Sequence, residues 1–178
     1  MIKTVRHSGM KFIDDNAFHI ENSPTYTRLK EEKSIKSVEL ILSKGNKLLF
    51  IEAKSSFPNP NNPMPNPDKG YKTGSELFRE EIKNICDKFI HPLNLYSAIK
   101  IGVAEGEFPQ EYNPSKKVSL VFVLVIRCFE RPWCSYIERA LKNRIFESIC
   151  IEKIWKPEVH VLNHEAAIQR NLTAGLCT

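Results

Sequence analysis

Two glutamates and a lysine are spaced so that their side chains could act on one substrate. Glu39 lies in a strand-like apolar run, and a second such run carries Glu52 and Lys54 at its end. The Gly45-Asn46 dipeptide between the runs favours a tight hairpin turn. A turn centred on this dipeptide places Glu39 directly opposite Glu52. Side chains two residues apart on a strand share a face, so Lys54 should point the same way as Glu52.

This arrangement favours chemistry over stability. Opposed carboxylates on a sheet repel each other, and apolar neighbours on both strands would remove water from them. A divalent cation removes the conflict, and two carboxylates completed by waters and a substrate phosphate suit Mg²⁺. A neighbouring ammonium can hold a phosphate oxygen or an attacking water. The pattern therefore predicts a site for Mg²⁺, or Mn²⁺, that acts on a phosphodiester.

The same residues resemble the active site of the PD-(D/E)xK, or restriction-endonuclease-like, nuclease superfamily. In that family an acid on one hairpin strand is followed, on the next strand, by Glu-x-Lys, here Glu52-Ala53-Lys54. The resemblance implies that Glu39, Glu52 and the backbone carbonyl of Ala53 bind the metal, and that Lys54 assists the nucleophilic water. The first acid departs from the family pattern, which usually has Asp after Pro where this chain has Val38-Glu39.

A further carboxylate and a simpler interpretation of the hairpin both stay open. The resemblance implies that an upstream acid, here Glu21, could add a carboxylate to the metal site, but Glu21 also reads as a helix-entry acid. The alternative for the hairpin is an edge position, with Glu39 and Glu52 facing water. Against that alternative, Glu52 interrupts an apolar run, where a charge is costly unless it is used.

Composition sets modest bounds on the class of protein. A chain of 178 residues, with 42% hydrophobic and 26% charged residues, is expected to form a single domain, residues 1–178. A net charge of +5 permits a nucleic-acid partner. Five cysteines without a Cys-x-x-Cys pair favour reduced thiols in a cytoplasmic protein. The longest apolar run, Leu120 to Ile126, is too short to span a membrane.

The order of elements indicates an α/β fold: a mixed central β-sheet with flanking helices, restriction-endonuclease-like. The expected helices are 25–32, a long one beginning at a Thr73/Glu76 capping box, 132–146 and 164–172; the expected strands are 17–20, the hairpin, 119–126 and 158–162. The cations beside the apolar stripe of the long helix favour a solvated face over a track for phosphates: Arg79, Lys83 and Lys88.

The segment 55–74 differs in composition from the rest of the chain. Five prolines alternate with asparagines, so a loop of extended segments and turns is expected. Because it leaves directly from Lys54, it must lie near the predicted site. A substrate-covering flap and a mobile linker are both compatible with the sequence.

These features together predict a metal-dependent nuclease that hydrolyses phosphodiester bonds, with DNA favoured as the nucleic acid. The alternative is a non-catalytic nucleic-acid-binding or protein-assembly module on the same fold, since fold does not establish activity. An intact set of Glu39, Glu52 and Lys54 at an open cleft would favour the enzyme. Lys54 held in a structural pair would favour the module. The sequence leaves the oligomeric state open, a homodimer included.

Overall fold

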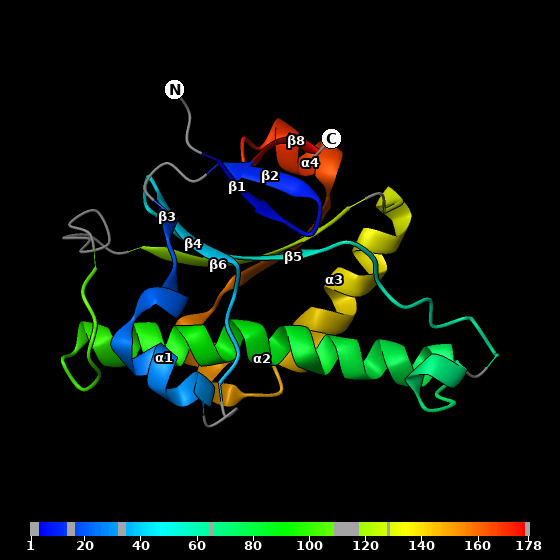
Figure 1. Ribbon diagram of the computed structural model, residues 1–178, viewed down its shortest axis with the longest axis horizontal. Helices are drawn as coiled ribbons and strands as arrows, with labels where there is room; N and C mark the ends of the chain where they lie inside the picture. Colours follow the sequence, from blue (N-terminus) through cyan, green and yellow to red (C-terminus); the bar gives the residue numbers. More distant parts are fainter. Residues whose placement is uncertain are drawn as a thin grey trace.

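A mixed five-stranded sheet, in the order β3-β4-β5-β6-β7, forms the centre of the molecule (Figure 1). The computed structural model describes residues 4–13, 17–31, 35–64, 66–108, 118–127 and 129–176. The strands are β3 (Ala17–Phe18), β4 (Leu40–Lys44), β5 (Lys47–Lys54), β6 (Ser119–Ile126) and β7 (Glu158–Asn163). Neighbouring strands are antiparallel from β3 to β5 and parallel from β5 to β7. The expectation of a mixed sheet with flanking helices is confirmed.

The hairpin has the register that its turn predicted. Gly45 has a φ of 61°, a left-handed conformation that glycine adopts readily, and Lys44 pairs with Lys47. Pairing continues outward to Leu40 opposite Ile51. Glu39 lies one residue beyond this last pair, at a bend, and its N–H donates to the Ile51 carbonyl over 3.0 Å. The next step outward in the same register is Glu39 opposite Glu52.

Helices cover one face of the sheet. The longest, α2 (Gly74–Lys100), lies across the strands below the sheet in Figure 1, with α1 (Pro24–Glu31) and α3 (Arg131–Ile145) beside it. Its N-terminus has the predicted capping box of Thr73 and Glu76. Its apolar stripe packs on the sheet, and the rings of Phe89 and Phe122 stack with centroids 4.8 Å apart. No helix within the described ranges is long and apolar enough to cross a membrane.

A second, three-stranded sheet covers the opposite face, and the sequence did not predict it. Its order is β1-β2-β8, with β1 (Thr4–His7), β2 (Met10–Ile13) and β8 (Thr173–Leu176). Met10 and Phe12 are fully buried between the two sheets, together with Ala167 of α4 (His164–Gln169). The turn between β1 and β2 consequently reaches the ends of the central strands.

In the described part of the chain there are also three short 3-10 or π-helical segments. They are η1 (Ile20–Asn22), η2 (Pro67–Lys69) and a π-helical segment, η4 (Cys150–Trp155). Of the five cysteines, Cys86, Cys134 and Cys150 are free thiols. The other two, Cys128 and Cys177, lie outside the described residues, as do Glu32 of the predicted first helix and Pro65 of the predicted loop.

The Pro- and Asn-rich loop runs from the end of β5 to the start of α2 (Figure 1). Its asparagine side chains accept hydrogen bonds from backbone N–H groups two residues on, at Asn59, Asn62 and Asn66. Phe57 is buried against Phe78 of α2, with ring centroids 5.6 Å apart. The N–H of Gly74 donates to the Asn62 carbonyl over 3.0 Å. The described part of the loop is therefore seated against the first turn of α2.

Candidate active site

Glu52 is the most deeply buried of the predicted site residues. Its exposed fraction is 0%, and its carboxylate faces α2, where Lys88 Nζ lies 2.6 Å from Oε1. Oε2 is also buried and has no hydrogen-bond partner among the described residues. Burial raises the pKa of Glu52 to about 7, although the ammonium of Lys88 acts to lower it. One oxygen of this buried carboxylate thus makes no hydrogen bond within the described residues.

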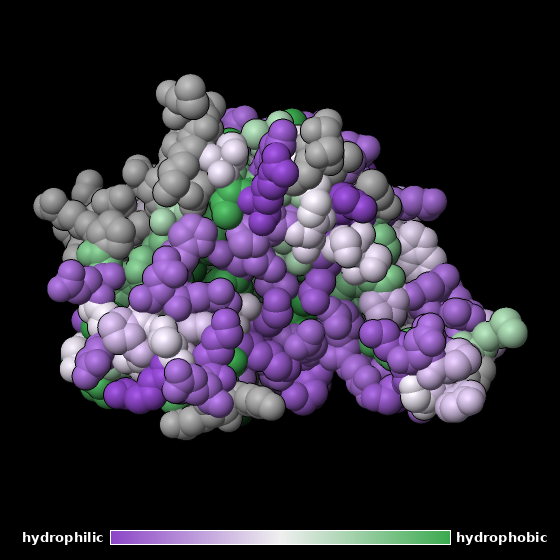
Figure 2. Space-filling model, viewed as in Figure 1, coloured by the Kyte–Doolittle hydropathy of each residue, from purple (hydrophilic) through white to green (hydrophobic). Residues whose placement is uncertain are grey.

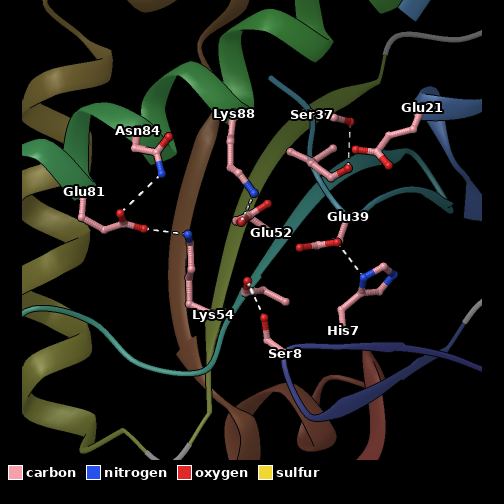
Figure 3. A network of polar contacts seen from close by, with 12 residues as sticks. His7, Ser8, Glu21, Ser37, Glu39, Glu52, Lys54, Glu81, Asn84 and Lys88 are labelled. Carbon is pink, nitrogen blue, oxygen red and sulfur yellow. Dashed lines mark hydrogen bonds and ion pairs between the residues drawn. The ribbon is translucent and has the colours of Figure 1, made fainter. Parts of the chain in front are cut away.

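Glu39 lies beside Glu52 in Figure 3, at the point where its strand leaves the ladder. Its Oε2 is 2.6 Å from Nδ1 of His7 in β1. Burial acts to raise the pKa of Glu39, but His7, Lys88 and Lys54 together hold it below its ordinary value. The hydrogen bond to Glu39 in turn raises the pKa of His7. The charge of Glu39 also contributes to the raised pKa of Glu52, so the two acids interact as the register predicted.

Lys54 points to the same side of the sheet as Glu52 but is held by a different acid. Its Nζ lies 2.7 Å from Oε1 of Glu81 on α2, and Asn84 Nδ2 donates to the other oxygen of Glu81 over 3.4 Å (Figure 3). The charge of Lys54 nevertheless acts on the pKa of both Glu39 and Glu52. The predicted trio is therefore gathered in one place, and Lys54 is engaged in an ion pair.

A cavity of about 690 Å³ opens beside Lys54, between the seated loop and the first half of α2. Its walls carry cations, carboxylates and amides as well as apolar groups: Lys54, Lys69, Glu80, Glu81, Asn66, Asn84 and Phe57. Hydrophilic side chains dominate the surface between the β1–β2 hairpin and α2 (Figure 2). The opening is suited to a polar ligand that reaches Lys54 from the loop side.

The remaining two predicted ligands also have partners within the chain. The Ala53 carbonyl accepts a hydrogen bond from Ser8 Oγ over 3.0 Å. Glu21 accepts one from the hydroxyl of Tyr26 in α1 over 3.1 Å. Its charge still contributes to the raised pKa of His7. Glu21 is thus close enough to affect His7 electrostatically, but its carboxylate is engaged by Tyr26.

The donor set is compatible with a hard cation. Carboxylate oxygens of Glu39 and Glu52, with the Ala53 carbonyl, are the oxygen donors that Mg²⁺ and Mn²⁺ accept. Oε2 of Glu52 has no partner in the described part of the chain, so it is a buried acceptor that could bind such an ion. Within the described residues there is no cluster of three or more His, Cys, Asp or Glu side chains that could hold a metal. Any ion here would therefore depend on the carbonyl and on water or substrate for further ligands.

Three contacts at the candidate site were not predicted from the sequence. Lys88, expected on a solvated face, instead has a side chain only 24% exposed and binds Glu52. The expectation for Lys88 was wrong because this residue lies at the edge of the α2 face that packs on the sheet. Ile85, three residues before Lys88, and Pro92, four residues after it, are both buried. The other two contacts come from His7 and Ser8, in a segment whose strands were not recognised.

Comparison with models of protein families, with curated proteins and with solved structures finds no match. The resemblance to the PD-(D/E)xK superfamily therefore stays a prediction based on the Glu39, Glu52 and Lys54 pattern.

Proposed function

We propose that this chain is a metal-dependent nuclease that hydrolyses phosphodiester bonds of nucleic acid, with DNA as the favoured substrate. The observation that carries the proposal is the carboxylate of Glu52. It is fully buried, one of its oxygens has no partner among the residues that the structure describes, and it interacts with a second carboxylate, Glu39. In a purely structural role this carboxylate would add little to stability, because a buried carboxylate is costly unless it is fully paired. A bound cation would make use of it.

In this proposal Glu39, Glu52 and the Ala53 carbonyl hold Mg²⁺ or Mn²⁺, which when bound polarises the phosphate and lowers the pKa of a coordinated water. Lys88 favours the ionised form of Glu52, since its ammonium opposes the desolvation that raises the carboxyl pKa to about 7. Lys54 supplies a positive charge at the mouth of the 690 Å³ cavity. A phosphate oxygen that enters there competes with Glu81 for the Lys54 ammonium.

The second candidate is a non-catalytic binding or assembly module on the same fold. The observation that favours it is that Lys54 is already paired with Glu81, while Glu39 is paired with His7. In a module these ion pairs hold the N-terminal hairpin and α2 to the sheet. Affinity for nucleic acid would then come from diffuse phosphate contacts, and no single lysine would dominate it.

Cleavage and binding measured together on Lys54→Ala separate the two candidates. With Mg²⁺ or Mn²⁺ and single-stranded, double-stranded and branched DNA and RNA, the nuclease should lose 10²–10³-fold in rate, about 3–4 kcal/mol, while its affinity changes little. The matched control is Lys72→Ala, which removes a cation paired with Glu80 near the same end of α2. This control should retain its rate.

The metal requirement is tested in the same proteins. Mg²⁺ at millimolar concentration should raise the melting temperature of the wild type, because an ion that binds only the folded state stabilises it. Glu52→Gln should lose both this shift and cleavage. Wild-type protein that binds nucleic acid but cleaves none of the substrates with either metal would instead establish the module.

A further inference from the structure

The turn of the β1–β2 hairpin is fitted closely against the ends of the central strands. It consists of Ser8 and Gly9, with φ of 50° and 75°, the left-handed conformations of a two-residue hairpin turn. A Cβ on Gly9 would lie 2.2 Å from Nη1 of Arg127, the residue that follows β6. No side chain fits at that position without displacing the guanidinium. The turn therefore packs against the Arg127 side chain, beside the candidate site.

His7, the last residue of β1, contacts one proposed metal ligand directly. Its Nδ1 lies 2.6 Å from Oε2 of Glu39, and both side chains are largely buried, with exposed fractions of 21% and 26%. An ionised carboxylate can only accept, so Nδ1 carries the proton of this hydrogen bond. Glu39 lies beyond the paired part of β4. The Glu39 backbone is held by its N–H bond to the Ile51 carbonyl and by the contact of its own carbonyl with Nδ1 of His19. Its carboxylate is held by His7.

Ser8, the next residue, contacts a second proposed ligand. Its Oγ donates to the Ala53 carbonyl over 3.0 Å. Each contact uses only part of the acceptor: Glu39 keeps its other carboxylate oxygen, and a carbonyl oxygen has two lone pairs. His7 at the end of β1 and Ser8 in the turn thus contact two of the proposed ligands, and each ligand oxygen can still bind a cation (Figure 3).

We infer that His7 is a positioning residue for Glu39 and that the β1–β2 turn forms the outer shell of the metal site. The inference rests on the proposed function. Ligating carboxylates are commonly oriented by hydrogen bonds from outside the metal's own ligands, and losing such a partner typically costs 10–100-fold in metal affinity.

The test is the affinity of the full chain for Mn²⁺ and Mg²⁺, measured by titration calorimetry without substrate. His7→Ala should bind each metal about 10–100-fold more weakly. His7→Asn should recover affinity to within about 3-fold, because its amide nitrogen lies where Nδ1 lies in histidine. His7→Gln places its amide nitrogen near the position of Nε2 and should not recover it. Arg6→Ala, which removes an exposed cation from the same strand, is the matched control.

The outcomes separate this inference from the proposed function. Unchanged metal affinity in His7→Ala, or equal affinities in His7→Asn and His7→Gln, would overturn the positioning role while leaving a wild-type metal site in place. Tighter binding by His7→Ala would overturn it too, and would make the turn a block on the ligands. Wild-type protein that binds neither metal would remove the proposed function together with the inference.

Discussion

The ammonium of Lys88 lies 2.6 Å from Oε1 of Glu52, and this carboxylate has no exposed surface. The contact joins α2 to the middle of the central sheet at the one predicted site residue that is completely buried. Even so, burial outweighs pairing, because the pKa of Glu52 is raised to about 7. The folded protein thus holds a carboxylate whose charge at neutral pH depends on Lys88, and on any cation that joins it.

Replacing Lys88 by methionine should therefore destabilise the fold at pH 8. Methionine keeps most of the side-chain volume but removes the ammonium, leaving a buried carboxylate without its partner. We expect a loss of about 1–3 kcal/mol in the free energy of unfolding, below the range for fully buried pairs because Lys88 is partly exposed. Urea unfolding at pH 8 measures it.

The control for Lys88→Met is Lys83→Met on the same helix. Lys83 pairs with Asp87 but its side chain is 62% exposed, so its loss should cost less than about 0.5 kcal/mol. Adding Glu52→Gln to Lys88→Met should restore much of the stability, since the uncompensated charge is then absent. Equal effects of the Lys83 and Lys88 replacements would contradict the importance of the Glu52 contact.

The pH dependence of stability should reveal the raised pKa of Glu52. The folded carboxyl, with a pKa of about 7, retains a proton that the unfolded chain, near the ordinary value of 4.5, has already released. Its contribution to stability is thus present below about pH 4.5 and is lost as pH rises to about 7. Relative to Glu52→Gln, which cannot ionise, the wild type should lose up to about 3 kcal/mol across that window.

Chemical unfolding of both proteins at pH 5 and pH 8 measures this difference. Carboxylates whose pKa is lowered in the fold, such as Asp87 and Glu138, act in the opposite direction at lower pH. They are common to both proteins and cancel in the comparison. A difference between wild type and Glu52→Gln that stays constant from pH 5 to pH 8 would mean that Glu52 titrates normally.

The parts of the site that could be predicted from sequence are those set by local signals. Gly45-Asn46 determined the hairpin register, and β6 occupies the predicted residues because β-branched and apolar residues continue through both faces. The small sheet had no comparable signal. Its strands are four residues long, and β2 pairs with β8 from the other end of the chain. Such non-local pairing leaves little trace in either segment.

Lys88 illustrates a residue that a closer reading of the helix could have found. Its buried neighbours at three residues before and four after place it on the edge of the stripe that faces the sheet. A lysine ammonium that faces the sheet from this position is partly buried and requires an acidic side chain on the sheet as its partner. Which acid it meets depends on how α2 crosses the strands, and the sequence pattern of the helix does not specify that angle. The contacts of His7 depend on packing between distant segments in the same way.

The packing of the loop against α2 can be tested by adding a single methyl group at Gly74. Gly74 is the first residue of α2, and a Cβ there would lie 2.2 Å from the carbonyl oxygen of Asn59 and 2.8 Å from that of Asn62. Both obstacles are backbone atoms, so Gly74→Ala should push the loop away despite the better helix propensity of alanine. We expect a cost of about 1–3 kcal/mol in stability and faster hydrogen exchange across 55–64. Ser75→Ala, at the exposed next position, should change neither quantity appreciably.

Because the displaced loop lines the cavity beside Lys54, the same variant also tests whether the loop serves the site. A loop that holds substrate against Lys54 should, when displaced, weaken binding or cleavage of nucleic acid in Gly74→Ala but not in Ser75→Ala. The metal-induced rise in melting temperature should persist, since Glu39, Glu52 and the Ala53 carbonyl lie outside the cavity walls. Faster hydrogen exchange in 55–64, with binding and cleavage of nucleic acid unchanged, would assign the loop a purely structural role. An unchanged rate of hydrogen exchange would show that small shifts of the Asn59 and Asn62 carbonyls accommodate the methyl group without displacing the loop.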